Sequence, residues 1–122
     1  MKKPSISYFA EEKYQCHSCR KDKIERSEVD ITWCCPDCGQ YIYIYASDEE
    51  SRGVFIRKRA TEIVKGDLVR PNHFKLEEHY QVLGINALTT KKHIGKLGLG
   101  LKGFRQEIVG PNDFISCRVG AW

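Results

Sequence analysis

The chain has 122 residues, of which 30% are charged and 41% are hydrophobic, as in an ordinary soluble globular protein. This length predicts one domain or two very small ones, and a part of 50 residues or fewer usually needs a metal ion or disulfide bonds to stay folded. No apolar run approaches the ~20 residues that span a bilayer, so we expect no membrane partner.

The positive charge is unevenly placed. Residues 1–48 hold 7 Lys and Arg against 8 Asp and Glu, whereas residues 49–122 hold 13 against 8, and the whole chain carries +4. The near-neutral first part and the basic second part favour a polyanionic partner. The alternative is a surface that is merely soluble, because an excess of this size is within the ordinary range.

The first expected element is a leader or short strand, SISYF, at residues 5–9. The start of the chain has two lysines but lacks the apolar core of a signal peptide, which favours a cytoplasmic location. Five of the six cysteines follow within residues 14–45. Their clustering in close pairs indicates metal binding in a reducing compartment rather than a secreted disulfide scaffold.

Four of these cysteines form two C-x2-C pairs, Cys16 with Cys19 and Cys35 with Cys38, separated by 15 residues. Each pair makes a tight turn with two thiolates about 3.5–4 Å apart, and two such turns complete a tetrahedron around one Zn²⁺. Gly39 permits the positive φ with which the chain leaves the metal. Since four thiolates leave no open position for water, we expect one structural Zn²⁺. A thiol-disulfide role for either pair is the weaker alternative.

At these residues the chain resembles the four-cysteine zinc-ribbon proteins, which carry C-x2-C, a strand region, C-P-x-C-G and a further strand. The likeness covers about residues 14–45 and predicts a zinc-ribbon module over residues 1–48. It implies Cys16, Cys19, Cys35 and Cys38 as metal ligands. It does not indicate an activity, since zinc ribbons occur in transcription factors, RNA polymerase subunits, ribosomal proteins, transposases and adaptors. The charged stretch between the pairs leaves open a short helical turn and the subtype of ribbon.

Two further cysteines and one histidine are not predicted to bind the metal ion. Cys34 lies one residue ahead of the second pair, at the end of an expected strand ITWC, and is predicted to be a packed or partly exposed thiol. His17 lies inside the first pair and is expected at the surface or beside the site. Cys117 shares an expected strand face with Ile115 and Val119, which predicts a core residue.

The stretch YIYIYA at residues 41–46 predicts a strand with tyrosines on one face and isoleucines on the other. The tyrosines either stack nucleic-acid bases, or they are covered because the strand lies between the two modules. The polar stretch SDEESRG at residues 47–53 predicts a solvated turn, and VFIRKR at residues 54–59 predicts the returning strand of a hairpin.

Short strands separated by turns recur beyond this hairpin and predict a small β-barrel over residues 49–122. The expected strand segments are VKGDLVR, HYQVLGINAL with a possible bulge at Gly84, KLGLGLKG, FRQEIV and FISCRVGAW. Their order over about residues 60–120 resembles the SH3-like small barrels. The predicted fold is therefore mainly β, a zinc ribbon followed by a small SH3-like barrel.

Basic residues of this second part are candidates for phosphate contacts, because lysine and arginine along one face neutralise phosphates. Residues 91–105 carry five basic residues and no acidic one, between several glycines. The predicted nucleic-acid-binding residues are Arg57, Lys58, Arg59, Lys91, Lys92, Lys96, Lys102 and Arg105. The alternative is a solvated sheet edge whose lysines prevent aggregation.

The sequence offers no constellation for catalysis. His73, His79 and His93 are scattered, and no serine or cysteine has the setting of a nucleophile, so we expect neither an enzyme nor a small-molecule substrate. The favoured hypothesis is a zinc-binding accessory protein that contacts DNA or RNA through its basic part. The other hypothesis is an adaptor or inhibitor that docks on a larger protein complex.

Overall fold

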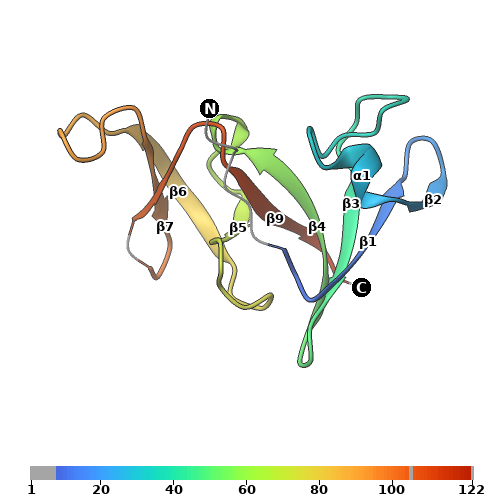
Figure 1. Ribbon diagram of the computed structural model, residues 1–122. Coiled ribbons are helices and arrows are strands. Elements are labelled where there is room, and N and C mark those ends of the chain that lie inside the picture. The colour runs from blue at the N-terminus through green and yellow to red at the C-terminus, as the bar shows by residue number, and fades with distance from the viewer. Residues whose placement is uncertain (1–7, 105, 122) are drawn as a thin grey trace.

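Antiparallel strands make up most of the regular secondary structure, as the mainly β prediction expects (Figure 1). The computed structural model describes residues 8–104 and 106–121. The expected strand at residues 5–9 and the basic residue Arg105 therefore lie partly or wholly outside the described residues.

The elements follow one another with short connections. The strands are β1 (Glu11–Cys16), β2 (Lys21–Ile24), β3 (Tyr43–Ser47), β4 (Arg52–Arg59), β5 (Leu68–Arg70), β6 (Tyr80–Ala87), β7 (Leu97–Leu101), β8 (Glu107–Val109) and β9 (Phe114–Gly120). One turn of α-helix, α1 (Arg26–Val29), follows β2, and one turn of 3-10 helix, η1 (Ala60–Glu62), follows β4. Among the described residues, no helix has the length and apolar character that a membrane crossing requires.

The strands form a single sheet in the order β2-β1-β3-β4-β9-β5-β6-β7-β8. In Figure 1 the strands β1 to β3 and the helix α1 lie on one side, and β6 and β7 lie on the other. The C-terminal strand β9 lies in the middle, between β4 and β5. The last strand of the chain thus joins the cysteine-bearing part of the sheet to the rest.

The predicted barrel over residues 49–122 is not confirmed, because the sheet is open. Strand β9 is paired on both sides, through Cys117 with Ile56 of β4 and with Val69 of β5. Within residues 49–122 the two outer strands are β4 and β8, which do not pair, and the other edge of β4 is taken by β3. The division at residues 48 and 49 stays a prediction, and β3 and β4 pair directly across it, with Tyr45 opposite Val54.

The two central strands separate two hydrophobic cores. Phe55 of β4 and Phe114 of β9 belong to the first core, which also contains buried residues of β1, α1 and β3. Ile115 and Cys117 of β9 belong to the second core, together with residues of β5, β6 and β7. Because neighbouring side chains of a strand point to opposite faces, β4 and β9 are covered on both faces.

The predicted hairpin around residues 47–53 is present, with Ile44 opposite Phe55. The bulge expected at Gly84 is also present, as a register shift between Val82 and Gly84 where β6 pairs with β7. Both features depend on local sequence signals, alternation of apolar residues in the first case and a glycine within a strand in the second.

The expected strand ITWC is wrong. Only one residue of it, Cys34, forms a bridge, with Tyr41, while residues 30–33 make turns. The short helical turn that the sequence allowed between the cysteine pairs is α1. A capping box stabilises its start: the backbone N–H of Glu25 donates to the carboxylate of Glu28, and the backbone N–H of Glu28 donates to the side chain of Glu25.

Candidate metal centre

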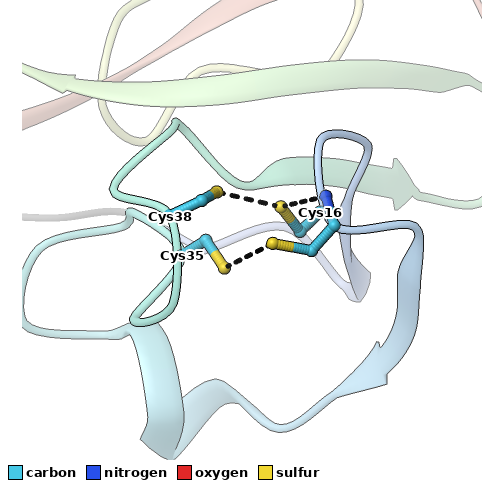
Figure 2. A group of neighbouring side chains, drawn as sticks. Cys16, Cys35 and Cys38 are labelled. Carbon is cyan, nitrogen blue, oxygen red and sulfur yellow. Dashed lines mark hydrogen bonds between the residues drawn. The ribbon is translucent and has the colours of Figure 1, made fainter.

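Four cysteine sulfur atoms lie together at one end of the sheet, all within 4.8 Å of one another. Figure 2 shows Cys16, Cys35 and Cys38 with their sulfur atoms turned toward a common centre. The Sγ atoms of Cys16 and Cys38 are 3.5 Å apart, and those of Cys19 and Cys35 are 3.9 Å apart. Four thiolates at ~2.3 Å from a tetrahedral Zn²⁺ would be about 3.8 Å from one another. The four predicted ligands therefore fit one tetrahedral metal ion.

The backbone of each cysteine pair forms a tight turn that presents its two thiols. In the first pair the backbone N–H of Cys19 donates to the Sγ of Cys16 at 3.4 Å. In the second pair the N–H of Gly39 donates to the carbonyl of Cys35 at 2.8 Å. The residues that follow the two pairs, Arg20 and Gly39, both adopt positive φ, 55° and 75°. The two turns are thus similar, although only the second contains a glycine there.

Trp33 fixes the approach to the second turn. It is fully buried, and its φ of 57° is one that bulky residues rarely adopt. The backbone N–H of Trp33 donates to the backbone carbonyl of Val29, and the backbone carbonyl of Trp33 accepts from the N–H of Ile42. These two bonds join α1 and the start of the tyrosine strand on either side of the turn that carries Cys35.

Cys34 is not part of the group of four sulfur atoms, as the register of the two pairs predicts. Its thiol is half-buried beside the carboxylate of Glu62. Burial, together with that carboxylate, raises the pKa of the Cys34 thiol and so lowers its reactivity. Cys117 is a core residue, and burial raises its pKa to about 12. Val119, expected on the same face, is exposed.

The tyrosine strand carries an aromatic group beside the metal site. Ile42 and Ile44 are fully buried in the first core, whereas the tyrosines between and beside them are partly exposed. The ring of exposed His17 stacks on Tyr43, with ring centres 3.9 Å apart and planes 9° apart. The Nε2 atom of His17 lies 3.0 Å from the hydroxyl of Tyr45. His17, expected at the surface or beside the site, thus joins the first cysteine turn to β3.

Arg57, a predicted phosphate contact, is instead fully buried, so we withdraw it from the candidate surface. Its guanidinium donates to both oxygens of Glu12, at 2.8 and 2.5 Å, and lies 4.3 Å from the centre of the Trp33 ring. Burial alone would raise the pKa of Glu12, but the hydrogen bonds and charge of Arg57 outweigh it and hold this pKa below its ordinary value of 4.5.

The other predicted basic residues do not form one continuous surface. Lys58 of β4 pairs with Asp67 at 3.0 Å, and Arg59 lies over the ring of Phe114. Lys91, Lys92 and Lys96 are exposed in the connection from β6 to β7, and exposed Lys102 follows the opposite end of β7. The structure thus brings three of the predicted residues together in one connection and places the other described ones, Lys58, Arg59 and Lys102, outside it.

Comparison with known protein families, with curated proteins and with solved structures finds no significant match.

Proposed function

We propose that this protein is a non-enzymatic zinc-binding accessory protein that contacts nucleic acid through lysines of the β6–β7 hairpin. The proposed ion is one structural Zn²⁺, because four thiolates fill a tetrahedral site and leave no position for a substrate or a reacting water. Its role is to hold the small end of the sheet together, where few residues are available to form a core.

The proposed fold assignment follows the same division as the sequence prediction. The two cysteine turns joined by β1, β2, α1 and β3 are consistent with a zinc ribbon. Strands β5 to β8 are consecutive neighbours and β9 returns beside β5, an order consistent with an SH3-like arrangement that stays open.

One observation carries the nucleic-acid proposal. Lys91, Lys92, Lys96 and Lys102 form no ion pair within the described part of the chain. Several basic side chains of other elements are neutralised, as in the pairs Lys21–Asp37 and Arg57–Glu12. Unpaired, exposed ammonium groups in an acid-free connection are free to replace the counterions of a phosphate backbone.

The test is the salt dependence of binding to a short duplex and to a short single strand. Each phosphate contact adds about one unit to the slope of log affinity against log salt concentration. Changing both Lys91 and Lys92 to glutamate should weaken binding and flatten that slope by about two units. The melting temperature should change little, because exposed charges contribute little to folding.

A matched control separates a local contact from net charge. Lys65 and Lys75 are also exposed, and changing both to glutamate alters the net charge by the same amount. The control variant should keep most of the affinity. Equal losses of affinity in the two variants would contradict a local contact at the β6–β7 hairpin, because net charge alone would explain them. Absence of any binding by the unchanged protein at low salt would overturn the proposal.

The second candidate function is a protein-interaction module, and exposed apolar side chains on the same hairpin favour it. Ile94, in the lysine-bearing connection, is 72% exposed, and Leu83 of β6 is 51% exposed. An acidic partner protein would then meet the lysines, and the change at Lys91 and Lys92 would mainly slow its association. This candidate replaces the first if nucleic acid does not bind.

A further inference from the structure

An open hollow of about 380 Å³ adjoins the first cysteine turn. Its lining residues are Gln15, Cys16, His17, Arg20, Lys21 and Asp22. It is distinct from the β6–β7 hairpin, because β1 and β2 lie at the opposite end of the sheet order. A hollow of this size accommodates one nucleotide rather than a folded partner.

One lining residue, His17, belongs to a pair of stacked aromatic rings. His17 and Tyr43 are nearly parallel, at 9° and with ring centres 3.9 Å apart, and His17 is the exposed ring of the two. Tyr45 fixes the imidazole from the side through the contact at 3.0 Å. A further planar ring that stacks on His17 would extend an existing stack without reordering these side chains.

Polar and basic groups surround the rings. In the register of β1 with β3, Gln15 lies opposite Tyr43 and Lys13 lies opposite Tyr45. Arg20 is exposed and forms no ion pair in the described part of the chain, while Lys21 pairs with Asp37. The acidic side chains nearby are Asp22 in the hollow, Asp37, which Lys21 neutralises, and Glu11, which accepts a hydrogen bond from Ser47. A guanidinium and an amide beside an exposed ring suit a phosphate and a base edge.

We propose that this hollow binds one unpaired nucleotide of a single strand, with the base stacked on His17 and the phosphate beside Arg20. The inference rests on the proposed function and adds which form of nucleic acid the protein prefers. Bases of a duplex are stacked on one another and cannot reach His17, so the ring gives a preference for single strands. The metal ion then has a second role, because the cysteine turn that it closes also positions the stacking ring.

The experiment compares His17→Ala with His17→Phe in the full-length, metal-loaded protein. Affinities for a labelled single-stranded oligonucleotide and for its duplex are measured by fluorescence anisotropy. Loss of one base stack should weaken single-strand binding by roughly 5- to 150-fold in His17→Ala, with duplex binding nearly unchanged. His17→Phe keeps a ring that can stack on Tyr43 and should stay within about threefold of the unchanged protein.

Metal content provides the check on folding, since His17 is not among the four metal-site residues. Both variants should hold as much metal as the unchanged protein. The inference is overturned if His17→Ala binds the single strand as well as the unchanged protein does, or if His17→Phe loses as much affinity as His17→Ala. Single-strand and duplex binding that both depend on Lys91 and Lys92, with no effect at His17, would reject this site and keep the proposed function. Absence of nucleic-acid binding by the unchanged protein would reject both.

Discussion

The residues that follow the two cysteine pairs share a left-handed backbone conformation, yet the sequence predicts this conformation for only one of them. Gly39 signals its positive φ because glycine adopts this conformation without steric cost. Arg20 adopts a φ of 55° with a full side chain, so nothing in its identity predicts the turn. The similarity of the two turns follows from the shared task of presenting two thiols to one centre.

Gly39→Ala should lower the free energy of unfolding of the metal-loaded protein by about 1 kcal/mol, the usual cost of a left-handed non-glycine residue. An added Cβ at Gly39 meets no atom within 4 Å, so the loss is one of backbone conformation and not of packing. Arg20→Gly is the opposite control and should raise the same quantity by up to about 1 kcal/mol. Denaturant titration measures both, and an unaltered value for Gly39→Ala would contradict this account.

At the scale of elements, β4 is a strand whose existence the sequence predicts but whose burial it does not. Its alternation correctly predicts a strand, but a strand with RKR at its end reads as a surface segment. Arg57 is buried because residues distant in the chain cover its face of the sheet, where its guanidinium lies over the rings of Phe9 and Trp33. Its partner Glu12 comes from β1, so no local signal links the two charges.

Glu12→Gln should destabilise the protein by about 3 kcal/mol, because it removes the carboxylate charge that the buried guanidinium of Arg57 faces. Both side chains of this pair are fully buried. The double variant Glu12→Gln with Arg57→Met removes the stranded charge and should recover at least half of the loss. A double variant as unstable as Glu12→Gln would contradict this explanation, because the loss of stability would then not come from the buried charge of Arg57.

The pH profile of Glu12→Gln tests the same contact. The folded-state pKa of Glu12 lies below its ordinary value of 4.5, so its stabilising effect is complete above that pH and is lost as the pH falls through the folded-state pKa. Acid also protonates thiolates of the candidate metal centre, in both proteins alike. The difference in unfolding free energy between the unchanged protein and Glu12→Gln should therefore be constant above pH 4.5 and shrink below it.

At the scale of the whole molecule, the mainly β fold, the hairpin between β3 and β4 and the four clustered cysteines follow from the sequence. The closed barrel does not, because closure would need β8 to pair with β4, the other outer strand of residues 49–122. That edge of β4 is taken by β3, which continues the sheet toward the cysteines. Alternation of apolar residues predicts strands and their faces, but it does not encode partners that lie far apart in the chain.

The grouping of the lysines is another property of the whole molecule. Lys91, Lys92 and Lys96 are close in sequence and lie together in one connection. The charge pattern of the sequence was therefore sufficient to predict that they group together. Lys58 and Arg59 reach other parts of the sheet and acquire neighbours of their own. Basic residues in a connection are thus better guides to an exposed surface than a basic run within a strand, such as residues 57–59 of β4.

We propose that Cys16, Cys19, Cys35 and Cys38 bind one metal ion and that Cys34 does not bind it. The zinc-to-protein ratio tests this proposal, by elemental analysis of the purified unchanged protein, of Cys35→Ser and of Cys34→Ser. We expect about one zinc per chain in the unchanged protein and in Cys34→Ser, and little or none in Cys35→Ser, because loss of a thiolate breaks the tetrahedral set. Equal loss of zinc from both variants, or an unchanged protein without zinc, would contradict the account.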